Sequence, residues 1–178
     1  HRRLRQLPPA AHDLLQLAAV IGREVQFGWL LSASPHPQPQ TLATLSLLTQ
    51  RQFLRETAEA YQFSHDKVRE SIYHDMPAGV RRQYHQQIAA VIATQQPTAV
   101  DLLAYHTQHG EQWAEAIAYT VQAADQARAL YALSHALHQY ALALHLLETH
   151  APLRPEQAHQ MRYHILLARQ PLLYLTGQ

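Results

Sequence analysis

The chain contains no cysteine and only five glycines in its 178 residues. Without cysteine, disulfides, thiolate metal sites and cysteine nucleophiles are all excluded. The glycines are dispersed and no G-x-x-x-x-G-K-[ST] sequence occurs, so we expect no glycine-rich loop that cradles phosphate. Neither G-x-S-x-G nor H-E-x-x-H is present, which removes the signatures of serine hydrolases and zinc proteases. We therefore expect this chain not to be an enzyme by itself.

Long apolar runs are also missing, and the charge is close to balanced. No apolar stretch approaches the roughly 18 residues that a membrane helix needs, so we expect no membrane partner. Residues 1–82 hold ten Arg and Lys against seven Asp and Glu, and residues 83–178 hold four against six; +3 and −2 sum to the net charge of +1. Neither half is basic enough to indicate nucleic-acid binding.

The beginning of the chain, "HRRLRQLPPA", has no Met and no signal-peptide layout. Together with the absence of cysteine, this favours a cytoplasmic location and a chain taken from the interior of a longer protein.

The N-terminal part combines helical periodicity with one alternating ribbon. We predict a first helix from Pro8–Pro9 to about Gly22, a second over Glu24–Leu31, and a third over Thr41–Arg51. "FLRE" (53–56) and "AYQF" (60–63) then alternate, which predicts a short hairpin. Three helices followed by a two-stranded ribbon is the order of a winged helix, which we assign to residues 1–76.

The remaining residues, 77–178, read as helices throughout, with turn signals near Pro97, Gly110 and Pro155. Two small-residue patterns resemble those of tetratricopeptide repeats: Ala116-x-x-x-Thr120-x-x-Ala123 and Ala136-x-x-x-Tyr140-x-x-Ala143. They lie 20 residues apart (136 minus 116) rather than about 34, so they belong to consecutive helices of degenerate repeats. We therefore predict a mostly α protein whose residues 77–178 form an antiparallel tetratricopeptide-like solenoid; a generic helical bundle is the alternative.

Fourteen histidines raise the question of a metal site. His135, His138 and His145 share one helical stripe, and His106 and His109 are three residues apart. Histidine sites usually recruit carboxylates or ligands from other elements, and acidic residues are sparse here, so we predict no metal site.

A His65-Asp66 pair follows the predicted hairpin and precedes a helix with Val68 and Ile72 on its apolar face. Ser64 is the expected N-cap, and Asp66 in the first turn would complement the helix dipole. A helix N-terminus binds anions, so His65 is our candidate contact to a phosphate. A plain capped helix start is one alternative. A His-Asp dipeptide of a metal-dependent phosphohydrolase is another, but it would need further ligands on neighbouring helices.

The segment "YQFSHDKVRESIYHDMPAGVRRQYHQQIAAVI" resembles the C-terminal part of bacterial STAND-type signalling ATPases. Those proteins carry a hydrophobic-x-F-x-H-D-x-x-R-E-x-x-Y stretch, then an R-x-x-x-H helix, then tetratricopeptide-like helices. The opening "RLRQLPPAAHDLLQLAAVIGREV" and the later "AYHTQHGEQWAEAIAYTVQAADQA" resemble the entry and continuation of the same region. The positions that match the two central motifs are Phe63, His65, Asp66, Arg69, Glu70, Tyr73, Arg81 and His85.

The resemblance implies a non-catalytic regulatory region in which residues 1–76 gate the nucleotide state of an upstream domain that holds ATP or ADP with Mg²⁺. In related plant and animal receptors, the histidine of a Met-His-Asp motif reaches the β-phosphate of ADP. Ser64 replaces that methionine here, so the role passes to His65 by position, with Asp66 beside it. Residues 77–178 would then receive a protein or peptide partner.

Two other functions compete with this interpretation. A DNA-binding winged helix needs basic residues on its third helix, where "TLATLSLLTQRQ" offers only Arg51, and phosphate contacts would fall to Arg2, Arg3, Arg5 and Arg55. We therefore expect no direct DNA contact. A peptide-binding scaffold without any nucleotide role is the other alternative.

Overall fold

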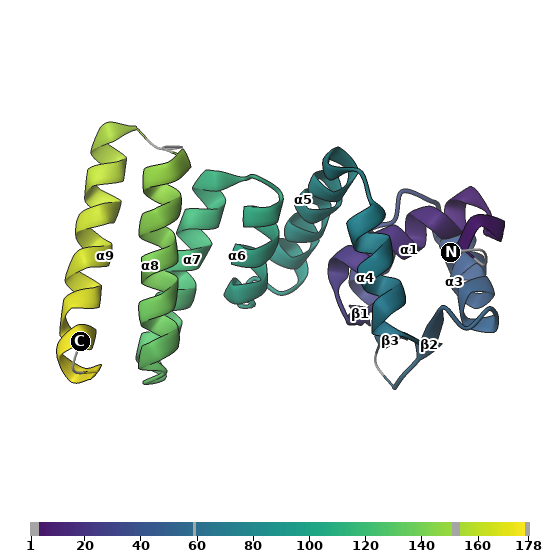
Figure 1. Ribbon diagram of the computed structural model, residues 1–178, viewed down its shortest axis with the longest axis horizontal. Coiled ribbons are helices and arrows are strands. Elements are labelled where there is room, and N and C mark those ends of the chain that lie inside the picture. Colours follow the sequence, from purple (N-terminus) through teal and green to yellow (C-terminus); the bar gives the residue numbers. More distant parts are fainter. Residues whose placement is uncertain (1–3, 59, 151–153, 177–178) are drawn as a thin grey trace. The chain divides into compact units, whose positions relative to one another are not determined.

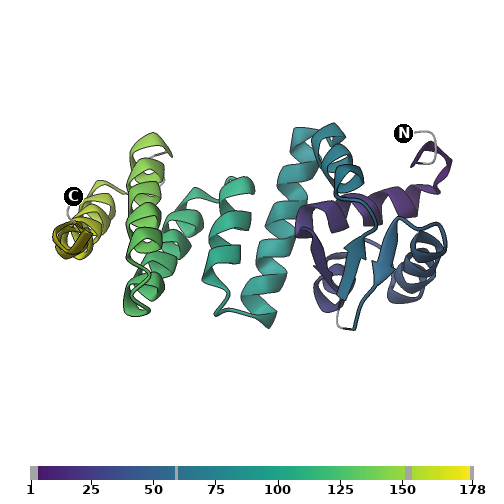
Figure 2. The ribbon, with the colours of Figure 1, turned by 60° about the horizontal axis from the view of Figure 1, so that its bottom comes forward.

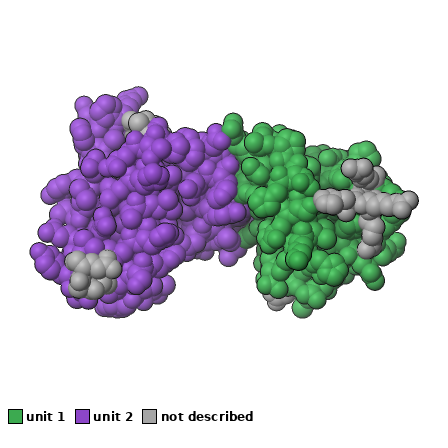
Figure 3. All heavy atoms as spheres, viewed as in Figure 1, with its two compact units in different colours: residues 1–91 green, residues 92–178 purple. Residues whose placement is uncertain are grey.

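The computed structural model describes residues 4–58, 60–150 and 154–176. Across these ranges the chain is mostly helical, with nine α-helices and one small antiparallel sheet of three strands (Figure 1). The mostly α class predicted from the sequence is confirmed. The chain divides into two compact units, residues 1–91 and 92–178 (Figure 3). The predicted boundary after residue 76 falls between two helices, α4 and α5.

Unit 1 alternates helices with short strands (Figure 2). A 3-10 turn over Leu4–Gln6 precedes the first helix. The elements that follow are α1 Pro9–Ile21, β1 Glu24–Gln26, α2 Phe27–Ala33, α3 Gln38–Gln50, β2 Leu54–Glu56, β3 Ala60–Phe63 and α4 Asp66–Asp75, and α5 Ala78–Gln95 begins in this unit.

The sheet has the order β1-β3-β2, with both pairs antiparallel. The β2–β3 pairing, with Arg55 opposite Gln62, confirms the predicted hairpin. The predicted second helix is wrong at its start, because residues 24–26 form β1 and the helix begins only at Phe27. Val25 is fully buried between two exposed neighbours, which is the alternation of a strand. The strand pairs with the edge of β3 that β2 leaves free.

The core of unit 1 is built around α1, which packs on α2, α3 and α4. Its buried residues lie on several sides of the helix, because other elements surround it. Leu14, Leu15 and Leu17 have no exposed surface, and they belong to the same buried set as Leu30 and Leu48.

Unit 2 is a run of helices in which each packs antiparallel on the next (Figure 1). They are α6 Val100–His109, α7 Trp113–Ala129, α8 Leu133–His150 and α9 Pro155–Thr176. The α6–α7 and α7–α8 turns share one hydrogen-bond pattern, which places Glu111 (φ 56°) and Tyr131 (φ 57°) in the left-handed region.

The two small-residue patterns predicted from the sequence lie inside unit 2. Ala116 and Ala136 have no exposed surface, and the buried Thr120 hydroxyl donates to the Ala116 carbonyl at 2.6 Å. Small side chains allow α7 and α8 to approach closely, while Tyr140 fills the space between them.

Candidate functional site

The structure places His65 and Asp66 at the start of α4, as predicted, but with a different cap. His65 is itself the N-cap (φ −143°, ψ 122°), is exposed, and makes no side-chain cap hydrogen bond. The prediction of Ser64 as the N-cap is wrong, because the first helical hydrogen bond, from the Arg69 N–H at 3.4 Å, is accepted by the carbonyl of His65 and not by that of Ser64. The Asp66 carboxylate is half-exposed and lies 3.6 Å from Nε of Arg23.

Three residues singled out by the resemblance form one cluster between α4 and α5. The Tyr73 hydroxyl and Nε2 of the buried His85 lie 2.9 Å apart. The Arg81 guanidinium lies 5.1 Å from the centre of the Tyr73 ring and donates to the Tyr73 carbonyl at 3.3 Å. This cluster joins the C-terminal end of α4 to α5.

His36, His135 and His164 each lie beside one carboxylate. Within the described ranges, no three His, Asp or Glu side chains are placed to hold a metal ion. Nε2 of His135, on α8, lies 3.1 Å from Oδ1 of Asp101, on α6. His106 is only 1% exposed, and burial, followed by the nearby His109, lowers the pKa of His106 to about 4. A histidine with such a pKa stays neutral at pH 7.

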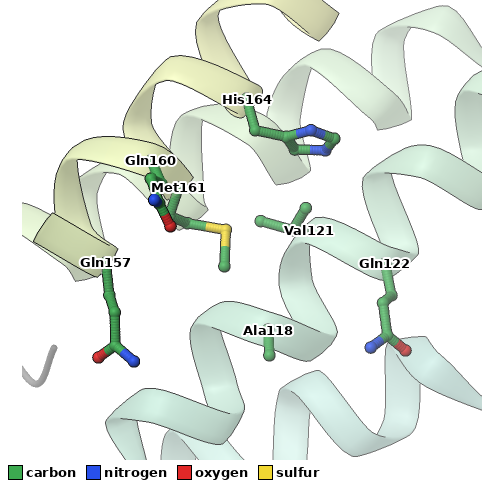
Figure 4. A pocket seen from close by; sticks show the side chains of 7 residues that line it. All are labelled: Ala118, Val121, Gln122, Gln157, Gln160, Met161 and His164. Carbon is green, nitrogen blue, oxygen red and sulfur yellow. The ribbon is translucent and has the colours of Figure 1, made fainter.

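An open groove of about 520 Å³ lies between α7 and α9 (Figure 4). Met161 and Val121 face each other across its centre and, with Ala118, make an apolar floor. Glutamine carboxamides from both helices and one imidazole line the groove around this apolar floor. These polar residues are Gln122 on α7 and Gln157, Gln160 and His164 on α9.

The His164 end of the groove is fixed by one carboxylate, Asp125. Its Oδ1 accepts a hydrogen bond from the buried Tyr140 hydroxyl on α8 and lies 3.5 Å from a nitrogen of Arg128. Its Oδ2 lies 3.6 Å from Nε2 of His164 on α9. Burial and the hydrogen bond to Asp125 raise the pKa of Tyr140 far above its ordinary value, so the hydroxyl remains a donor. Asp125 therefore connects α7, α8 and α9.

The lining of the groove offers polar and apolar side chains for noncovalent contacts. Its lining contains no hydroxyl, thiol or amine that would act as a nucleophile, although His164 and Asp125 have the relation of a base and its orienting carboxylate. The carboxamides offer both donors and acceptors, while the thioether of Met161 adapts to apolar groups of different shapes.

The groove between α7 and α9 was not predicted from the sequence. The signal that was present is the spacing of Gln157, Gln160, Met161 and His164, which recur at i, i+3, i+4 and i+7 on one face of α9. That spacing alone does not distinguish a groove wall from an exposed helix face.

No protein family, curated protein or solved structure matches the chain. Among the described helices, none combines the length and the apolar character needed to cross a bilayer.

Proposed function

We propose that the chain is a non-catalytic regulatory region whose second unit binds a peptide segment of a partner protein. The α7–α9 groove carries this proposal, because it combines an apolar floor with convergent carboxamides from two helices. Ligand sites in proteins are typically concave, mostly apolar, and oriented by a few polar groups. The Gln122, Gln157 and Gln160 amides would meet the backbone of an extended peptide, and the floor would take one apolar side chain.

The arrangement of unit 2 supports a tetratricopeptide-like solenoid as the scaffold of this site. Its helices pair antiparallel in chain order, and the groove lies between alternate helices, α7 and α9, with α8 packed on both. Stacked helix pairs of this kind create extended concave surfaces that bind peptides.

A selection from a random nine-residue phage-displayed library tests the peptide site. We expect the wild-type chain to enrich peptides with an uncharged, apolar centre, and Met161→Glu to weaken the selected peptide at least roughly tenfold, since the new carboxylate would be desolvated on binding. Leu102→Glu makes the same chemical change on exposed α6 and is the matched control. Equal affinity of the Met161→Glu and Leu102→Glu chains would refute the site.

The second part of the proposal assigns unit 1 to the gating of an upstream nucleotide-binding domain, with ATP or ADP and Mg²⁺ held there. The order α1-β1-α2-α3-β2-β3 supports a winged helix, and β1 adds a strand to the predicted ribbon. The observation that favours nucleotide sensing is His65, exposed at the start of a ten-residue helix with no cap bond of its own. Its imidazole and the N–H groups of the first turn would contact a phosphate. Arg23 would partly offset the negative charge of Asp66, whose carboxylate it approaches to 3.6 Å.

Retention of ADP by the longer protein tests this assignment. We expect His65→Ala to release bound ADP several-fold faster and to raise basal ATPase activity, whereas His159→Ala, at an exposed histidine of α9, should change neither. Unchanged nucleotide handling in His65→Ala would leave residues 64–67 as an ordinary helix start, and the peptide site would be unaffected.

Direct DNA contact is not part of the proposal. Helix α3 contains no Arg or Lys, and Arg51 follows only at its C-cap. Arg55 donates to the Gln62 side chain at 2.8 Å. Arg2 and Arg3 lie outside the described residues, and the side chain of Arg5 is not described either. A cytoplasmic location remains part of the proposal.

A further inference from the structure

The two methionines of the chain lie in opposite environments. Met76, at the end of α4, is 3% exposed and belongs to the buried core. Met161, on α9, is partly buried and lines the α7–α9 groove, where its thioether faces Val121 (Figure 4). Since the chain contains no cysteine, these two thioethers hold its only sulfur atoms.

Access and packing both single out the sulfur of Met161. The groove has a volume of about 520 Å³. A water-sized molecule occupies roughly 30 Å³, so a small hydroperoxide has room to reach the thioether. The same side chain packs against two buried clusters of unit 2, one that contains Tyr140 and one that contains Ile117. A polar atom added to Met161 would therefore lie beside apolar side chains of more than one helix.

We propose that Met161 is an oxidation site, and that its sulfoxide closes the groove to apolar ligands. The oxidant is a hydroperoxide, such as hydrogen peroxide. One peroxide oxygen is transferred to the thioether sulfur as the O–O bond breaks and the S–O bond forms. The sulfur is oxidised by two electrons, and the proton of the transferred oxygen moves to the leaving oxygen, which departs as water. Methionine sulfoxide reductases, one for each sulfoxide epimer, restore the thioether.

The sulfoxide makes the floor of the groove polar. Its oxygen accepts hydrogen bonds and donates none, and the side chains of Val121 and Ala118 offer no donor. The donors of the lining are the glutamine carboxamides and His164, which a bound peptide would itself need. An apolar peptide side chain over the floor would bury the S–O group without a partner, which weakens binding by roughly tenfold or more. This consequence rests on the proposed peptide site, whereas the oxidation does not.

Peptide mapping by mass spectrometry, after exposure of the folded chain to hydrogen peroxide, tests the modification site. We expect Met161 to gain one oxygen at least roughly tenfold faster than Met76, because the sulfur of Met76 is buried in the core. In concentrated urea the two rates should be equal, since unfolding removes the difference in burial. Equal rates in the folded chain would overturn the proposal, and so would faster oxidation of Met76.

The affinity for a peptide selected by the unmodified chain tests the consequence. Peroxide should weaken this binding roughly tenfold, and both reductases with dithiothreitol should restore it. Met161→Leu, whatever its initial affinity, should bind equally before and after peroxide. Met76→Leu is the matched control and should lose affinity on oxidation as the wild type does. Unchanged affinity of a chain oxidised fully at Met161 would overturn the closing of the groove. Failure of the untreated chain to select any peptide would instead overturn the proposed function, and the two oxidation rates would still decide the modification site.

Discussion

Acid should destabilise unit 2 through one histidine. His106 is 1% exposed on α6, and burial lowers its pKa to about 4, whereas an unfolded histidine titrates near 6.5. Because the folded pKa is the lower one, the unfolded chain binds more protons between about pH 6.5 and pH 4. Stability is therefore lost as the pH falls through this window, and the loss is complete below about pH 4. The difference of roughly 2.5 pKa units corresponds to about 3 kcal/mol, of which about 2 kcal/mol is lost by pH 5.

The assay is urea unfolding followed by tryptophan fluorescence at pH 7.5 and pH 5.0. Each unit contains one of the two tryptophans, Trp29 in unit 1 and Trp113 in unit 2, so a Trp29→Phe background reports on unit 2 alone. We expect His106→Leu to lose about 2 kcal/mol less than its parent between these pH values, whatever its stability at pH 7.5. The exposed His138→Leu is the control and should keep the parental pH dependence. An unchanged pH dependence in His106→Leu would refute the assignment of the acid loss to this buried imidazole.

Three further substitutions test local features of the fold by urea or thermal unfolding. Tyr140→Phe should lower the stability of unit 2 by about 1–2 kcal/mol, because it removes the only hydroxyl that α8 offers to Asp125 among the described contacts; no loss would mean that water replaces the bond fully. Tyr131→Gly should raise stability by about 0.5–1 kcal/mol, since Tyr131 holds φ 57° while 86% exposed, and a loss would show that its ring makes stabilising contacts. Gly22→Ala should cost about 1–3 kcal/mol through its φ of 136° alone, because a Cβ there meets no atom within 4 Å; a neutral result would mean that the α1 C-terminus relaxes.

The elements predicted correctly from the sequence are those long enough to show a clear apolar period of their own. Helices α7 and α8 have long apolar periodicities, and the two small-residue patterns lie one on each of these consecutive helices, as predicted. Strand β1 was missed because three residues are too few to establish a period, and only the free edge of β3 gives Val25 its strand conformation. Ser64 was assigned as a cap because it has a typical capping side chain, but the helical hydrogen bonds begin one residue later, at the His65 carbonyl.

The candidate site shows the same limit more clearly. His65 and Asp66 are adjacent in sequence, so a motif places both at the start of α4. The groove instead depends on Val121 and Met161, which are 40 positions apart (161 minus 121) and face each other because α8 packs on both of their helices. Helical spacing places each residue on the apolar face of its own helix. It does not predict that the two faces leave a groove between them.

Asp125 shows why the groove and the helix packing cannot be separated. A carboxylate on an open surface needs only water as its hydrogen-bond donor, and no particular side chain has to lie beside it. Asp125 instead accepts a hydrogen bond from Tyr140, which has no exposed surface, and lies within ion-pair distance of His164, which lines the groove. A change at Asp125 would leave a buried hydroxyl without its acceptor and would release one wall of the groove at the same time. A ligand of the proposed groove that bonds to His164 would therefore compete with Asp125, the carboxylate that also accepts from Tyr140.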